Sequence, residues 1–339
     1  MAKRSNVEKA ESVSVSPEQT AFAELGAALS ARVVGQPLLI ERLLIALLAD
    51  GHLLVEGAPG LAKTTAIKVL GEHLEADFHR VQFTPDLLPA DLTGTDVFRP
   101  QTGAFEFQHG PLFHNLMLAD EINRAPAKVQ SALLEAMAER QITVGAHSYA
   151  LPELFLVMAT QNPIEQEGTY PLPEAQLDRF LMYVRIGYPA LDAEREILRL
   201  AREEANGQLD GKGGQASGVR VDQRTIFAAR KAVLGLHVSD ALEEYLLQLV
   251  LATRSPGEWG EDLARWVRFG ASPRACIALE RCARARAWLA GRDYVSPEDI
   301  QALAPDVLRH RILLTFEAEA DGVSSDTLVA ELVRRVPVP

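Results

Sequence analysis

The sequence has little cysteine, few aromatic residues and no long apolar run. Cysteine accounts for 2 of the 339 residues, and aromatic residues make up 6% of the chain. Cys276 and Cys282 lack the spacing of metal ligands, so we expect both to be reduced thiols. No stretch approaches the roughly 20 apolar residues of a membrane-spanning helix, and the N-terminus lacks the apolar block of a signal peptide. These absences predict a cytoplasmic protein without a membrane span.

Basic residues are also scarce relative to acidic ones. Lys and Arg number 34 against 46 Asp and Glu, which gives a formal net charge of -12. This balance disfavours non-specific binding to a nucleic acid backbone. With 47% hydrophobic residues the chain can bury a large core. At about 150 residues per domain, its length suggests two domains.

The stretch 52–65 is the feature around which the chain is organised. A short apolar run ends in glycines and a proline, and helical spacing resumes after a lysine, which is the order of a phosphate-binding loop. Backbone N–H groups would wrap the phosphates, Lys63 would reach the terminal ones, and the Thr64 hydroxyl would bind Mg²⁺. The usual motif has glycine where this chain has Ala62, so the stretch alone leaves an ordinary strand-to-helix turn open. The predicted nucleotide-binding residues are Gly57, Ala58, Pro59, Gly60, Leu61, Ala62, Lys63, Thr64 and Thr65.

Two later apolar runs each end in polar residues. Asp120 and Glu121 follow the run at 116–119, and Asn162 follows the run at 155–159. Parallel strands present such residues at the sheet edge where ligands bind. We expect Asp120 to hold Mg²⁺ through water, Glu121 to polarise the attacking water, and Asn162 to position that water or touch the terminal phosphate. The alternatives are a solvated acidic pair and a turn-forming asparagine before proline.

Three further segments allow two interpretations each. Val33 and Val34 precede the helix that leads to the loop strand, and they either contact the nucleotide base or form a plain apolar turn. Apolar residues flank turns at 97–107 and 141–151, which predicts two hairpins. The hairpin at 97–107 either packs on its own domain or lines a ring pore or grips a client, and the role of the hairpin at 141–151 is open. For Phe107 we favour packing, whereas the role of Phe105 is open.

Together these stretches resemble the MoxR-type AAA+ ATPases, and alanine before the lysine is usual in that family. The resemblance covers nearly the whole chain after the leader. It implies an α/β P-loop AAA+ core, with a parallel sheet flanked by helices and inserted β-hairpins, followed by an all-α lid. It also implies ATP and Mg²⁺ as cofactors, a hexameric ring, and chaperone-like work on partners that carry a von Willebrand factor A domain. The motifs that carry it are the loop 57–64, Leu118-Ala119-Asp120-Glu121-Ile122-Asn123-Arg124-Ala125, Ala159-Thr160-Gln161-Asn162-Pro163 and Pro173-Glu174-Ala175-Gln176-Leu177-Asp178-Arg179-Phe180.

The resemblance also assigns domains and two arginines. We expect a mobile leader at 1–16, a core at 17–188 and a lid at 189–339 with a flexible stretch near 206–218. Arg179 matches the arginine finger that completes a neighbour's site, with Arg124 as a competing candidate. Arg274 matches the second sensor and follows a capping Ser-Pro at a helix start, where it would point at a phosphate held between lid and core.

The sequence therefore predicts a Mg²⁺-dependent ATPase whose ring remodels or matures a protein partner. A DNA-translocating motor of the same superclade would need basic hairpins, and the segment 141–151 contains His147 but no lysine or arginine. A nucleotide-bound regulatory scaffold with little turnover is a second alternative, and the presence of every catalytic residue type argues against it.

Overall fold

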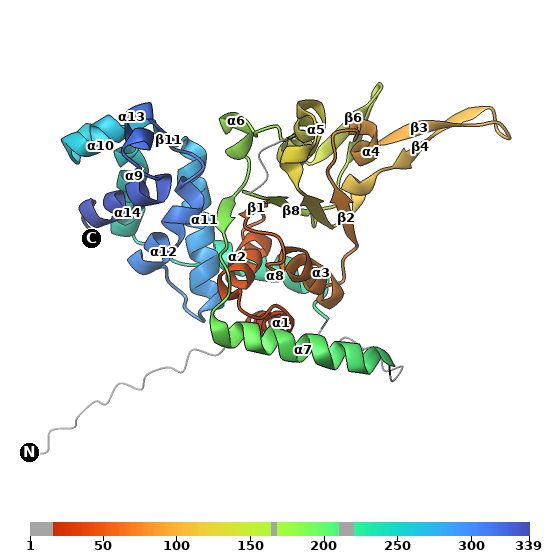
Figure 1. Cartoon of the computed structure of the whole chain (residues 1–339), viewed down its shortest axis with the longest axis horizontal. Helices are drawn as coiled ribbons and strands as arrows, with labels where there is room; N and C mark the ends of the chain where they lie inside the picture. The colour runs from red at the N-terminus through yellow and green to blue at the C-terminus, as the bar shows by residue number, and fades with distance from the viewer. Residues whose placement is uncertain (1–15, 164–167, 210–219) are drawn as a thin grey trace, which may run out of the picture.

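In the computed structural model, the described residues are 16–163, 168–209 and 220–339, and they form an α/β core joined to a helical lid (Figure 1). The core sheet is parallel, with strand order β2-β5-β8-β1-β9. Its strands are β1 (Leu53–Glu56), β2 (Phe78–Gln82), β5 (Leu116–Asp120), β8 (Leu156–Gln161) and β9 (Met182–Arg185). The core helices are α1 (Pro17–Arg32), α2 (Pro37–Leu48), α3 (Lys63–His73), α4 (Pro89–Thr93), α5 (Ala127–Glu139) and α6 (Glu174–Leu177). The predicted fold class is confirmed.

The central strands are apolar on both faces because helices cover both sides of the sheet. Side chains alternate along β1, so Leu53 and Val55 join one buried cluster and Leu54 joins the other. The first cluster continues into α1, α2 and the lid, whereas the second contains the apolar face of α5. This two-sided burial fixes the strand register and brings the carboxyl ends of β1, β5 and β8 to one edge of the sheet.

Two antiparallel hairpins are inserted in the core, as the sequence predicts. The first consists of β3 (Gly94–Arg99) and β4 (Ala104–His109), and it extends away from the core (Figure 1). The second consists of β6 (Gln141–Val144) and β7 (His147–Ala150). Phe107 stacks on Tyr149 with ring centroids 4.0 Å apart, which joins the two hairpins and confirms a packing role for Phe107. Phe98 and Phe105 form a cross-strand pair and are 51% and 71% exposed.

The helix α7 (Leu191–Leu209) connects the core to the lid and lies apart from the lid helices (Figure 1). Residues 206–209, which open the predicted flexible stretch, are its last turn, and residues 210–218 lie outside the described part of the chain. Residues 206–209 are therefore helical and not part of a flexible stretch. One glycine within a helix costs only about 1 kcal/mol, so the helix can continue through this segment.

The lid packs its helices against the core through one continuous apolar cluster. In the described part of the chain, no helix is both long and apolar enough to cross a bilayer. The lid elements are α8 (Gln223–Leu234), α9 (Asp240–Ala252), α10 (Glu261–Trp266), β10 (Val267–Phe269), α11 (Pro273–Leu289), α12 (Pro297–Leu308), β11 (Leu313–Leu314), α13 (Phe316–Ala320) and α14 (Ser325–Arg335).

Candidate nucleotide site

A cavity of about 580 Å³ opens at the carboxyl edge of the sheet. Its volume falls within the range of small-molecule sites, which is roughly 300 to 1,000 Å³. The phosphate-loop residues, the strand-end acids and residues of α7 border it together. The lining residues are Arg32, Val34, Pro59, Gly60, Leu61, Ala62, Lys63, Thr64, Thr65, Arg80, Gln82, Asp120, Glu121, Thr160, Asn162, Ile197, Leu200 and Ala201.

The loop has the tight backbone that its glycines predict. Gly60 has φ of 84°, and Ala62 has φ of 58° in the left-handed region, where a side chain costs about 1 kcal/mol or more. A Cβ atom at Gly57 would lie 2.5 Å from Ile186 Cγ1, so only glycine allows this close approach. Gly57 and Ala58, which the sequence also predicts to bind the nucleotide, are buried and do not line the cavity.

Lys63 begins α3 and folds back over the loop, where its Nζ donates a hydrogen bond to the Gly57 carbonyl. Burial lowers the pKa of Lys63, whereas the nearby carboxylates of Asp120, Glu121 and Glu56 act in the opposite direction. A half-buried ammonium group that faces a cavity favours an anionic ligand, because the anion replaces the lost hydration of the cation.

Thr160 holds both strand-end acids, Asp120 and Glu121. Thr160 is not among the site residues predicted from the sequence. The Thr160 hydroxyl donates to Asp120 Oδ1 at 2.6 Å and accepts from the Glu121 backbone N–H at 2.9 Å. Its side chain is 1% exposed. Arg80 binds the other oxygen of Asp120, with Nη2 2.6 Å from Oδ2. Both carboxylate oxygens of Asp120 are therefore fixed in direction.

Glu121 adopts φ of 57° directly after the strand, a conformation that non-glycine residues seldom take. Gln82 Nε2 donates to its Oε2 at 2.7 Å, and Arg124 Nε lies 3.1 Å from the same oxygen. The backbone turn thus aims Glu121 at the cavity, and its neighbours hold the carboxylate in place. Strain of this kind is typical of functional positions.

Asn162 lies at the end of β8, is 8% exposed and lines the cavity. Val33 and Val34, in the turn that precedes α2, have different environments. Val34 lines the cavity, whereas Val33 is 1% exposed in the core. The prediction that Val33 contacts the ligand is therefore corrected, because consecutive residues of the turn point to opposite sides.

A second cavity, of about 360 Å³, lies between α11 and the segment 178–181 that precedes β9, and it is rich in arginine. Arg179 and Arg274 both border it, and neither borders the first cavity. Arg179 Nη1 donates to the Leu134 carbonyl at 2.7 Å, and Arg274 Nη1 lies 3.5 Å from Asp178 Oδ2. Arg274 therefore borders the second cavity and not the first, and its contact with a phosphate held between lid and core stays a prediction. The start of α11 is bound to Asp178 through Ser272, at 2.9 Å.

Comparisons with known proteins decide the family. The profile of the ATPase family associated with various cellular activities (AAA) matches residues 52–182, and that of the AAA lid domain matches 263–332. Chaperone MoxR1 of Mycobacterium tuberculosis is 45% identical over 91% of this chain and 79% of its own length. Protein MoxR of Paracoccus denitrificans is 34% identical over 94% of this chain and 96% of its own. The chain belongs to the MoxR-type AAA+ ATPases.

A solved structure agrees with this membership. The crystal structure of a candidate ATPase from Cytophaga hutchinsonii shares 46% identity and superposes with a TM-score of 0.86, covering 95% of this chain and 96% of that one. As a member of this family, the protein is an ATPase with a nucleotide-binding AAA+ core. Lys63, Thr64, Asp120, Glu121 and Asn162, to which the resemblance assigns site roles, all border the first cavity.

Proposed function

We propose that this ATPase hydrolyses ATP with Mg²⁺ in the first cavity, works as a hexameric ring in the cytoplasm, and uses turnover for chaperone-like remodelling of a protein client. The observation that carries the proposal is the division of the catalytic residues between two cavities. The first holds groups that bind phosphates and activate water. The second holds arginines suited to stabilising charge on a phosphate.

The donors at the first cavity fit a magnesium nucleotide. Thr64 presents a hydroxyl and Asp120 a carboxylate, and oxygen is the ligand atom that Mg²⁺ prefers. Because Arg80 already binds Asp120 Oδ2, we propose that Asp120 acts on the cation through water. Bound Mg²⁺ would neutralise charge on the terminal phosphates. When the nucleotide binds, Lys63 Nζ would donate its hydrogen bond to a phosphate oxygen in place of the Gly57 carbonyl.

We assign activation of the attacking water to Glu121 and its orientation to Asn162. Glu121 is aimed by its backbone turn, and its carboxylate is held by Gln82 and Arg124. A positioned general base contributes about 10²- to 10⁴-fold to a rate. Arg124 contacts Glu121 of its own chain, which supports a role for Arg124 within one subunit and leaves the role across subunits to Arg179.

We propose that Arg179 and Arg274 enter the nucleotide site of an adjoining subunit. Their absence from the lining of their own first cavity supports this arrangement. Head-to-tail contacts of one surface with a different surface close into rings, which fits the hexamer proposed for this family. Hydrolysis would then require assembly, because each site needs groups from two chains.

Two observations support a protein client, namely the family of this chain and one exposed apolar surface. The M. tuberculosis relative is named a chaperone. The exposed Phe98 and Phe105 at the end of the first hairpin offer an apolar contact for a client. That the client carries a von Willebrand factor A domain follows from the family resemblance alone.

Two measurements test this function. ATP turnover per chain should rise with protein concentration and require Mg²⁺, since assembly completes the site. Turnover per chain that is independent of concentration across the assembly range would contradict the ring. The variant Glu121→Gln, loaded with ATP and Mg²⁺, should retain a von Willebrand factor A domain protein in a pull-down, whereas wild type in ADP should not. Equal recovery in both states would contradict a nucleotide-controlled client.

A further inference from the structure

A line of alternating charges runs from the entrance of the phosphate loop into the lid. It begins at Glu56, the last residue of β1, which directly precedes Gly57. Glu56 and Arg185 are register partners on the neighbouring strands β1 and β9. Arg185 Nε lies 3.0 Å from Glu56 Oε1, and the Tyr183 hydroxyl donates to Glu56 Oε2. Both oxygens of Glu56 are therefore held from the same strand.

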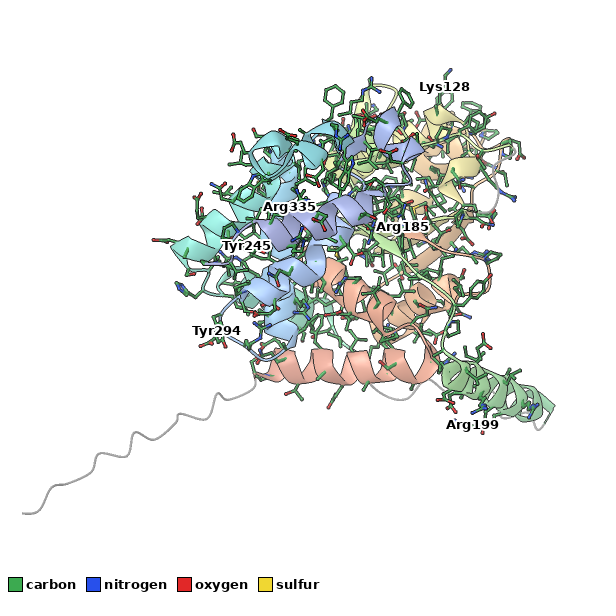
Figure 2. The ribbon with its side chains drawn as sticks, turned by 60° about the vertical axis from the view of Figure 1, so that its left-hand side comes forward. Lys128, Arg185, Arg199, Tyr245, Tyr294 and Arg335 are labelled. Atoms are coloured by element: carbon green, nitrogen blue, oxygen red, sulfur yellow. The ribbon has the colours of Figure 1, made fainter. Side chains whose placement is uncertain are left out.

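The lid contributes the next charge. Asp326 lies in the first turn of α14, where a helix favours an acidic residue. Its Oδ2 accepts from Arg185 Nη1 at 2.9 Å, and its Oδ1 accepts from Arg309 Nε at 2.8 Å. Figure 2 shows Arg185 where the strand β9 meets the helix α14. The planar guanidinium of Arg185 thus joins a core carboxylate to a lid carboxylate, which a flexible ammonium group could not do at both ends.

The far end of the line is buried and anchors the lid to the core. Arg309 Nη1 lies 2.6 Å from Asp306 Oδ1, and Arg42 Nε of α2 lies 2.7 Å from Asp306 Oδ2. The side chains of these three residues are 8%, 6% and 4% exposed. Arg309 also donates to the Tyr183 carbonyl on β9. Asp326 is therefore held by an arginine that two core elements fix in place.

The loop entrance is otherwise held by backbone contacts and by the packing of Gly57 against Ile186. The Gly57 N–H donates to the Gln161 carbonyl at 3.4 Å, which is a long hydrogen bond, and Gly57 has no side chain of its own. Lys63 closes the loop through the Gly57 carbonyl. Glu56 directly precedes Gly57, so the strand pairing and the Arg185 ion pair that hold Glu56 together set the position of the Gly57 carbonyl, to which Lys63 donates.

We propose that Arg185 is a positioning residue that holds the phosphate loop, through Glu56, in the conformation that receives a nucleotide, with Asp326 of the lid fixing Arg185. The lid thereby contributes to ATP affinity without contacting ATP. Preorganisation of a binding loop lowers the entropy that binding must remove. The inference rests on the ATPase assignment and requires neither the ring nor a client.

The test is equilibrium titration with a non-hydrolysable ATP analogue and Mg²⁺. Arg185→Gln and Asp326→Asn should each weaken binding about fivefold, which is the effect of one partly exposed ion pair. The double variant should also lose about fivefold, because both changes break the same connection. Arg185→Lys should recover part of the affinity. In steady-state assays the loss should fall on KM, with kcat at saturating ATP little changed.

Controls separate this role from simple stabilisation of the lid. Arg334→Gln removes a surface ion pair to Glu331 on the same helix and should leave affinity unchanged. Thermal unfolding of every variant reports structural damage. Unchanged affinity in both single variants, or a double variant weakened by the product of the two single effects, would overturn the proposal. If wild type itself failed to bind the analogue, the ATPase assignment would be at fault instead.

Discussion

The two cavities differ in their charged residues. The first is bordered by Lys63, Arg32 and Arg80 together with Asp120 and Glu121, and Thr160 orients these two acids. In the second, arginines crowd around Asp178. The first set can bind a nucleotide and activate water, and the second can stabilise negative charge. This difference is the basis of the proposal that hydrolysis requires contact between subunits.

The second cavity also contains a buried ion pair. Arg311 is 2% exposed and pairs with Asp178 at 2.8 Å, so the second cavity has a fixed ionic wall. Arg179 and Arg274 also border this cavity, and the Arg274 side chain is 58% exposed. A buried ion pair of this kind restricts the side chains behind Arg179 and Arg274, which is the support that a preorganised cationic surface needs.

The largest effect should come from Arg179→Ala. Loss of a cation that stabilises the transferring phosphoryl group should lower kcat by about 10³- to 10⁵-fold. Binding of ATP by the variant's own first cavity should be unchanged, because Arg179 does not line it. Parallel turnover assays and nucleotide titrations measure both. A variant that lost ATP affinity instead would place Arg179 in its own site.

The next effect is that of Glu121→Gln, which should bind ATP normally but turn it over about 10²- to 10⁴-fold more slowly. The amide keeps the size of the side chain and removes its basicity. Glu135→Gln makes the same change on the exposed face of α5 and should have no effect. Near-normal turnover by Glu121→Gln would remove Glu121 from the water-activating role.

Asp178→Asn should lower the free energy of unfolding by about 3 kcal/mol, because it leaves the buried Arg311 without its counter-charge. Denaturant titration followed by circular dichroism measures this. Asp192→Asn breaks an exposed pair with Arg195 and should change stability by less than about 0.5 kcal/mol. Similar losses in both variants would mean that the wall of the second cavity is not a fixed ionic unit.

A pH effect should come from His52, which borders the second cavity. Burial, with a further contribution from Arg140, lowers the pKa of His52 from 6.5 to about 3. The Val157 N–H donates to its Nδ1 at 3.0 Å, which requires the neutral ring. Between pH 6.5 and 3 the unfolded chain binds a proton here and the folded chain does not, so stability falls as the pH falls.

Protonation of His52 in the unfolded chain should lower the free energy of unfolding by about 2 kcal/mol between pH 7 and pH 5. His52→Gln keeps a hydrogen-bonding side chain that does not titrate, and its stability should fall by that much less over the same range. Identical pH profiles for wild type and His52→Gln would contradict a neutral, buried His52.

Much of the first cavity was predictable because its residues follow parallel strands. Lys63, Asp120 and Asn162 each lie at the carboxyl end of a strand or just after it, and such ends meet at one sheet edge. Their chemical roles stay predictions. Arg80 and Gln82 were missed because the pairing of β2 with β5 is a long-range feature that no local pattern specifies.

The lid was less predictable for the same reason. The capping Ser-Pro before Arg274 correctly predicts a helix start, but the site toward which that start points depends on packing against Asp178. The apolar residues of α7 fit any amphipathic helix, and only the fold shows that Ile197 and Leu200 border the nucleotide cavity. The amphipathic pattern of a helix predicts which of its faces is buried. It does not predict which other element packs on that face.

The most direct test of the division between cavities mixes two inactive variants. Lys63→Ala lacks the phosphate-binding lysine but keeps the second cavity, and Arg179→Ala has the reverse defect. Random assembly at equal amounts should restore about a quarter of wild-type turnover, since about one contact in four joins an intact first cavity to an intact Arg179. A mixture no more active than the two variants measured separately would contradict a site shared between subunits.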